Sequence, residues 1–155
     1  MRNALFALVV GLCASGCATS HYGNYSEALP TYDKAMAADT VTHLVKLYPP
    51  ALTRLNIGQQ ADDTYGVALV TALRMRGYSV SEYSPETSRA SQAENAFPLA
   101  STQAGIELRY IVDSLAPAVP LYRVTVLLGQ KTISRAYIPQ QSGTVTAAGS
   151  WARKE

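Results

Sequence analysis

Cysteine is scarce in this 155-residue chain, and the position of its two cysteines excludes most thiol chemistry. Both lie near the N-terminus, at Cys13 and Cys17, within or directly after an apolar segment. A domain formed by the residues that follow has no thiol for a disulfide, a metal site or a nucleophile. We therefore expect its stability to depend on the packing of its own core.

Residues with catalytic or metal-binding chemistry are equally few. The chain has two histidines, His21 and His43, and no H-E-x-x-H, G-x-S-x-G, G-x-x-x-x-G-K or paired-cysteine pattern. His43 flanks an apolar stripe, where a helix-flank residue is far commoner than a ligand. Asp62 and Asp63 are adjacent, so their side chains diverge, and helix capping explains them. We expect no catalytic residue, no metal site and no cofactor, and a protein that is not an enzyme.

A strong charge of either sign is also missing. Thirteen Lys and Arg residues against eleven Asp and Glu residues give a net charge of +2, and no basic run stands out. Electrostatic attraction to nucleic acid or anionic lipid therefore has little support. The sequence also has no surplus of large apolar residues to line a deep pocket, so no small-molecule substrate is expected.

The first seventeen residues carry the strongest functional signal. Arg2 precedes an apolar run over residues 4–13, and small residues lead to Cys17. This is the pattern of a secretory signal, and its end is similar to a bacterial lipobox, although Ala14 stands where Leu is usual. The run has about ten residues, fewer than the roughly twenty that span a bilayer. We expect a signal peptide over residues 1–16.

The lipobox resemblance implies cleavage between Gly16 and Cys17 and covalent lipid, a diacylglycerol and an acyl chain, on Cys17. Two acyl chains hold a protein stably on a membrane, whereas one gives marginal binding. Ala18 follows the cysteine, where Asp would favour retention at the inner membrane in enteric bacteria. The expected location is therefore the periplasmic face of the outer membrane. An uncleaved anchor and an ordinary signal peptide are the alternatives.

The segment after the signal is small and polar, with no helical or strand period. We expect residues 17–34 to form a flexible tether between the lipid and a single domain over residues 35–155. Tyr22 and Tyr25 lie in this tether and are candidate anchors for a partner, if the segment orders on binding.

Apolar periodicity predicts two helices. The first runs roughly from Met36 or Asp39 to Tyr48, and two prolines end it. The second follows a cap at Asp62 or Asp63 and ends before Gly77, which is well placed as the C′ residue.

Period-two alternation and turn signals predict a sheet. The expected strands are residues 52–57, 78–83, 106–113, 122–128 and 133–139, followed by a ragged edge at 143–151 with Trp151 as a hydrophobic plug. A long loop over residues 84–102 separates the two halves, and Gly129-Gln130 forms a tight hairpin turn. The predicted fold class is α+β: a small periplasmic two-layer domain with two helices on one face of a mainly antiparallel sheet of about five strands, in α-β-α-β-β-β-β order.

Two arginines on the outer face of this sheet are further candidates for partner binding. Arg109 and Arg123 fall on the solvent faces of neighbouring strands, alongside Glu107 and Asp113. Cross-strand charge pairs on a solvated face explain them, and a protein-binding face is the alternative.

Three segments together resemble a known family. They are Val-x-x-Leu-x-x-Leu-Tyr-Pro-Pro-Ala-x-Thr-x-Leu over residues 41–55, Tyr-Gly-x-Ala-Leu-x-x-Ala-Leu-Arg-x-Arg-Gly-Tyr-x-Val over residues 65–80, and the lipobox before both. The combination resembles the TrbH conjugal transfer lipoproteins, which are encoded among the mating-pair-formation genes of conjugative plasmids. The resemblance implies a non-enzymatic lipoprotein that supports assembly or stability of a conjugative type IV secretion complex, with other secretion-channel proteins as partners. A ligand-binding or envelope-maintenance lipoprotein unrelated to conjugation is the alternative.

Overall fold

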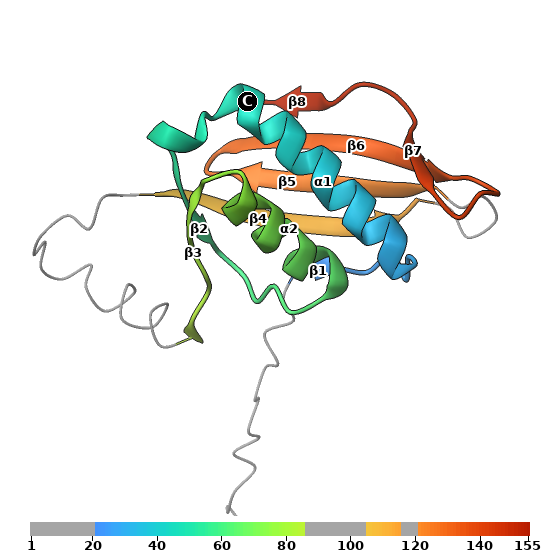
Figure 1. Ribbon diagram of the computed structural model, residues 1–155, viewed down its shortest axis with the longest axis horizontal. Helices are drawn as coiled ribbons and strands as arrows, with labels where there is room; N and C mark the ends of the chain where they lie inside the picture. Colours follow the sequence, from blue (N-terminus) through green and yellow to red (C-terminus); the bar gives the residue numbers. More distant parts are fainter. Residues whose placement is uncertain (1–20, 86–104, 116–120) are drawn as a thin grey trace, which may run out of the picture.

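The computed structural model describes residues 21–85, 105–115 and 121–155. Helices α1 (Pro30–Leu47) and α2 (Thr64–Met75) lie side by side on one face of an open mixed sheet (Figure 1). This arrangement confirms the predicted α+β two-layer fold. The expected signal peptide, the lipidation site Cys17 with its cleavage point at Gly16, and most of the expected 84–102 loop lie outside the described residues. Neither described helix is both long and apolar enough to cross a membrane.

Within the described residues the sheet has eight strands, three more than the roughly five expected. They are β1 (Gly23–Asn24), β2 (Arg54–Ile57), β3 (Ser79–Ser81), β4 (Ile106–Ser114), β5 (Tyr122–Leu128), β6 (Lys131–Pro139), β7 (Val145–Ala147) and β8 (Ala152–Lys154), with a short 3-10 helix at Pro50–Leu52. The main path runs β3-β2-β4-β5-β6-β7, while β1 pairs with β4 and β8 pairs with β6. Strand β2 pairs in parallel with both β3 and β4. The parallel β2–β3 pair is joined by α2, which crosses over between the two strands. From β4 onward the sheet is antiparallel, as predicted.

The segment before α1 is part of the domain wherever the structure describes it. Gly23 and Asn24 pair in parallel with Ile111 and Val112 of β4, and the Tyr25 amide donates to the Val112 carbonyl at 2.7 Å. The expected tether over residues 17–34 is therefore wrong for residues 21–34, and the domain begins before residue 35. A two-residue strand has no period, so periodicity could not reveal it.

Helix α1 starts at Pro30, six residues before the earliest expected start at Met36. Proline suits the first helical position because its missing N–H would have no partner there. The additional turns bury Tyr32 and Asp33 against the rest of the domain. The prediction was wrong here because the first turns are mostly polar and lack an apolar stripe.

Helix α2 follows its local signals closely. Asp63 is the cap, and its Oδ1 accepts the Gly66 amide at 2.9 Å. At the other end Gly77 has φ +87°, the Tyr78 amide donates to the Leu73 carbonyl, and the Gly77 amide donates to the Arg74 carbonyl. These two bonds form a Schellman motif, which requires a left-handed residue at C′. The predicted cap and C′ glycine are both confirmed.

The core lies between the helices and strands β4–β6. The inward positions of β4 and β5 alternate as predicted, and these six side chains are almost fully buried: Leu108, Tyr110, Val112, Val124, Val126 and Leu128. Leu128 pairs with Lys131, so Gly129-Gln130 is a two-residue turn, with Gly129 at φ +60°. The predicted hairpin is therefore confirmed.

The C-terminal segment differs from the expected single edge strand. Strand β7 pairs with one part of β6, at residues 137–139, and β8 pairs with another, at residues 132–134. Trp151 belongs to neither strand: it lies in the connection between them and is half-buried against the core.

Candidate functional site

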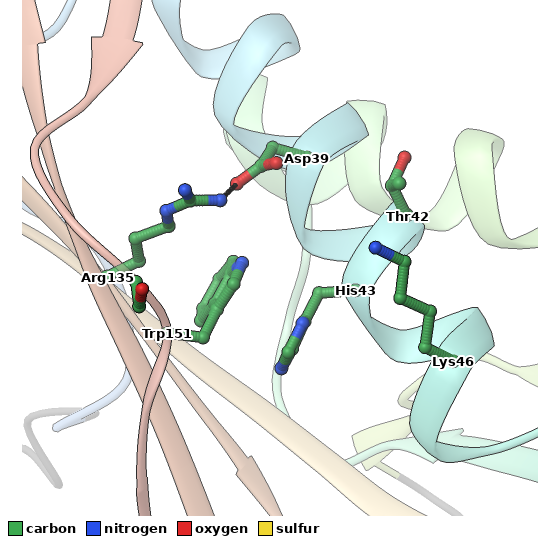
Figure 2. A pocket seen from close by; sticks show the side chains of 7 residues that line it. Asp39, Thr42, His43, Lys46, Arg135 and Trp151 are labelled. Carbon is green, nitrogen blue, oxygen red and sulfur yellow. Dashed lines mark hydrogen bonds and ion pairs between the residues drawn. The ribbon is translucent and has the colours of Figure 1, made fainter.

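A hollow of about 330 Å³ lies between α1 and the connection from β7 to β8, and we call it the α1 groove (Figure 2). Four of its lining residues lie along one side of α1, and the other three belong to β6 and to the β7–β8 connection. They are Asp39, Thr42, His43 and Lys46 on the helix, and Arg135, Ser150 and Trp151 opposite.

Trp151 forms a stacked wall of this groove. Its ring lies 5.0 Å from the His43 ring, centroid to centroid, with an interplanar angle of 11°. The guanidinium carbon of Arg135 lies 5.9 Å from the Trp151 ring. Figure 2 shows the indole between these two side chains. The stack therefore holds the β7–β8 connection against α1.

Arg135 is fixed in turn by polar contacts. Its Nη1 donates to Asp39 Oδ2 at 2.8 Å, and its Nε donates to the Gly149 carbonyl at 2.7 Å. The Tyr137 hydroxyl also donates to Asp39 Oδ2, at 2.7 Å. Burial, and then this contact with the carboxylate, raise the pKa of Tyr137 well above its ordinary value. Asp39 thus connects the helix to two residues of β6.

The groove is electropositive apart from Asp39. Burial lowers the pKa of His43, and the charges of Lys46 and Arg135 lower it further, against an opposing effect of Asp39. The net effect favours the neutral form of His43. Lys46 has no ion-pair partner among the described residues. The indole N–H of Trp151 is buried and meets no acceptor within the described chain.

Sequence reasoning missed this groove. The sequence predicts a helix-flank residue at His43 and a hydrophobic plug at Trp151, and it indicates no role for Arg135. A usable signal existed at Arg135, because it occupies a core-facing position between Ile133 and Tyr137 in an alternating strand. A charged side chain at such a position requires a partner. Nothing local indicated that the partner would be Asp39, 96 residues away in sequence.

The sequence candidates for partner binding lie elsewhere, on the sheet face away from the helices. The Arg109 guanidinium carbon lies 4.9 Å from the Tyr22 ring centroid, and Arg109 Nη2 donates to Glu107 at 2.7 Å. Tyr25 is 55% exposed, and its hydroxyl donates to the Tyr22 carbonyl at 3.3 Å. The structure therefore brings Tyr22, Tyr25 and Arg109 together beside β1.

Arg123 is engaged differently. It lies directly opposite Asp113 on the neighbouring strand, and its Nε and Nη2 contact the two carboxylate oxygens of Asp113. The expected cross-strand pair is thus present for this arginine. Whether Tyr22, Tyr25, Arg109 and Arg123 contact a partner stays a prediction.

Over the described ranges, no three His, Cys, Asp or Glu side chains lie close enough together to hold a metal ion. Three acidic side chains have structural contacts instead: Asp63 caps α2, Asp39 binds Arg135, and Asp113 pairs with Arg123.

Comparison with known proteins gives a family match. The family described as "Conjugal transfer protein TrbH" matches residues 19–155, a range that includes every helix and strand that the structure describes. No curated protein and no solved structure gives a match. The resemblance carried by residues 41–55 and 65–80 is confirmed, and it extends through the C-terminal strands. This chain belongs to the TrbH family of conjugal transfer proteins.

Proposed function

We propose that this protein is a non-enzymatic lipoprotein on the periplasmic face of the outer membrane, where it supports assembly or stability of a conjugative type IV secretion complex. The single observation that carries the proposal is the family match over nearly the whole chain. The lipobox-like sequence Ser15-Gly16-Cys17 supports the lipid anchor.

The position of β1 sets how far the domain can lie from such an anchor. Cys17 precedes Gly23 by six residues, and Gly23 is fixed by its pairing with Ile111. Six extended residues reach at most about 20 Å. A lipid on Cys17 would therefore hold the edge of the sheet close to the bilayer, which suits a protein whose partners are also membrane-embedded.

Complementation of a gene deletion tests the proposal. We expect deletion to reduce conjugal DNA transfer by at least about tenfold, the unmodified gene to restore it, and Cys17→Ser to fail. Cys13→Ser is the matched control, because that cysteine lies within the signal and should not be needed. Mass analysis of the purified N-terminus should show lipid on Cys17.

A normal transfer frequency after deletion would contradict the conjugation role, and an envelope defect in the same strain would favour the envelope-maintenance alternative. Affinity isolation from detergent-solubilised envelopes should also recover other proteins of the transfer apparatus. Their absence from the isolated material would count against the assembly role.

A further inference from the structure

One end of the sheet exposes large apolar side chains. Strands β4 and β6 finish together at this end, because Ser114 and Tyr137 both pair with Tyr122. The residues that follow Ser114 and Tyr137 are Leu115 and Ile138, and both are exposed. The sheet therefore ends here in apolar rather than charged side chains at these two positions.

The segment between β1 and α1 adds two more such side chains, Tyr25 and Leu29. Strand β1 runs parallel to β4, and Asn24 pairs with Val112, so the chain leaves β1 towards the same end. Figure 1 shows α1 beginning there, whereas the 3-10 helix lies at the opposite end. We call these four residues, each 40–55% exposed, the apolar end: Tyr25, Leu29, Leu115 and Ile138.

The chain before β1 limits how the domain can face a membrane. Lipid on Cys17 would lie six residues from Gly23, a reach of about 20 Å at most. Gly23 is level with Ile111, and Leu115 lies four residues farther along β4, or about 13 Å. The apolar end can therefore touch the bilayer that holds the lipid.

The opposite end of the domain lies beyond this reach, although it also exposes apolar side chains. Leu55 is level with Ile106, which precedes Ile111 on β4 by five residues. Leu52 precedes Leu55 by three more residues, so it lies about 25 Å from Gly23 along the strands. This distance exceeds the reach of the connection. The length of the connection therefore selects the apolar end over the opposite one.

The charges near the apolar end cancel. Asp113 and Arg123 form an ion pair on the outer face of the sheet, and Glu27 and Lys34 are exposed with opposite signs. A membrane contact at this end would therefore depend on apolar burial rather than on attraction to anionic lipid.

We propose that the apolar end rests in the headgroup layer of the bilayer that carries the Cys17 lipid. Its three aliphatic side chains enter the boundary with the acyl chains, and the Tyr25 ring lies at headgroup level, where an aromatic ring with a polar tip is well suited. Few side chains take part, but the lipid already holds the domain at the surface, so the contact forms within one anchored molecule. The inference deepens the proposed function and rests on its lipid anchor.

Fluorescence quenching in vesicles tests the inference. The full-length protein is purified with its lipid, labelled with the fluorophore NBD on one introduced cysteine, and placed in vesicles of phosphatidylethanolamine and phosphatidylglycerol. Leu115→Cys places the label at the apolar end, Leu52→Cys at the opposite end, and Thr125→Cys in the middle of the outer sheet face.

Lipids that carry a nitroxide just below the headgroup serve as quenchers. We expect quenching of the Leu115 label to be at least about threefold stronger than quenching of the other two, because docked apolar groups lie about 5–10 Å deep. Added salt should leave this difference unchanged, since no net charge drives the contact.

Three results would overturn the inference. One is equal quenching of the Leu115 and Leu52 labels. Another is strongest quenching at Thr125, which would mean that the outer face of the sheet lies on the bilayer. The third is emission of the Leu115 label at shorter wavelength without nitroxide quenching, which would indicate a contact between protein molecules.

A variant of the apolar end gives a second measurement. Leu29→Asp combined with Ile138→Asp should reduce quenching of the Leu115 label at least about twofold, because it removes apolar area from the contact. Leu52→Asp is the matched control, since Leu52 is 87% exposed but lies at the opposite end. Unchanged quenching in the double variant would contradict the inference.

The protein without an introduced cysteine distinguishes failure of this inference from failure of the proposed anchor. It should take up no label, because the Cys17 sulfur would be a thioether and Cys13 would leave with the signal. Labelling would show that Cys17 carries no lipid, and the anchor and this inference would fail together. Absence of labelling combined with weak quenching at Leu115 would overturn this inference alone and leave the anchor standing.

Discussion

Asp33 shows how one buried acid can set the pH dependence of this domain. Only 2% of the residue is exposed, Oδ2 accepts the Asn24 side-chain N–H at 2.9 Å, and Oδ1 meets no donor among the described residues. Burial raises the pKa of Asp33 to about 6, the bond from Asn24 opposes the rise, and the charge of Asp63 adds to it. Because the pKa of the folded state lies above that of the unfolded state, the native protein binds more protons between about pH 4 and pH 6. From this group alone, stability falls as the pH rises through that window.

Asp33→Asn should therefore raise the free energy of unfolding at pH 7.5 by about 1 kcal/mol, because it removes a buried charge and keeps an acceptor for Asn24. At pH 4 the gain should be close to zero, since the carboxyl of the unmodified protein is then protonated in the native state. Urea denaturation at both pH values measures the difference. The exposed Asp62→Asn serves as control, and a larger gain at pH 4 than at pH 7.5 would contradict the assignment.

Gly66 illustrates a helix position where the usual preference for alanine is reversed. A Cβ added there would lie 2.2 Å from the Tyr110 hydroxyl oxygen and 2.9 Å from backbone atoms of Ala61. That hydroxyl donates to Asp63 Oδ2, so it cannot move without losing a bond to the cap residue.

Gly66→Ala should lower the free energy of unfolding by about 1–3 kcal/mol, although helix propensity alone would raise it by about 1 kcal/mol. Val67→Ala, on the exposed side of the same helical turn, should change stability by less than about 0.5 kcal/mol. Thermal unfolding of both variants measures this difference. Stabilisation by Gly66→Ala would mean that Tyr110 does not pack against this turn.

At the scale of elements, β1 depends on a few polar contacts. Asn24 donates to Asp33 and accepts from both the amide and the hydroxyl of Ser26 at 3.0 and 2.7 Å. One edge of β4 pairs with β2 at residues 106–108 and with β1 at residues 111–112. Between these two pairings, the side chain of Gln59 accepts the Tyr110 amide at 2.8 Å. Side chains thus complete an edge that backbone pairing leaves interrupted.

Asn24→Ala should therefore release β1 without unfolding the domain. Hydrogen exchange of the Tyr25 amide, which is bonded to the Val112 carbonyl, should accelerate at least about tenfold. The Val126 amide in the centre of the sheet should keep its protection. Equal acceleration at both positions would indicate global destabilisation instead, and no change at Tyr25 would show that backbone pairing alone holds β1.

The sequence predicted some elements better than others. The difference depends on how far apart in sequence the residues that define each element are. Helix α2 carries its start and stop signals within itself, at Asp63 and Gly77, so local reasoning placed both ends. Strands β4 and β5 have clear alternation because one face is buried. Strand β1 has two residues, and its pairing partners are 88 residues away, so no local pattern could reveal it.

At the scale of the whole molecule, the pairing of β1 with β4 shortens the segment between Cys17 and the first residue fixed in the domain. Between Cys17 and Gly23 the chain reaches about 20 Å at most, whereas the expected tether of residues 17–34 would have reached about 60 Å. If Cys17 carries lipid, the domain is confined close to the bilayer, and if its partners are membrane-bound, as we propose, its local concentration around them is high.

Lengthening this connection is a direct test. Ten Gly/Ser residues inserted between Ala18 and Thr19 raise the mean reach of the connection from about 13 Å to about 22 Å and touch no described residue. We expect an unchanged midpoint of thermal unfolding and about fourfold weaker partner engagement, by the −3/2 power dependence of effective concentration on length. Transfer frequency should fall accordingly. Replacing residues 18–20 by Gly-Ser-Gly keeps the length and should leave transfer unchanged; equal transfer by the insertion variant would show that distance from the membrane is not used.

The sequence by itself determined the two-layer α+β class, the ends of α2, the β5–β6 hairpin and the membership of the TrbH family. Each of these depends on residues that are close in sequence or on a pattern that repeats along it. Only the tertiary structure decided that residues 21–34 belong to the domain, and that Asp39, Arg135 and Trp151 meet beside His43 to form the α1 groove. The physical reason is that these contacts join segments about 90 to 110 residues apart, and such pairings are selected by packing and burial of the complete fold rather than by local preference.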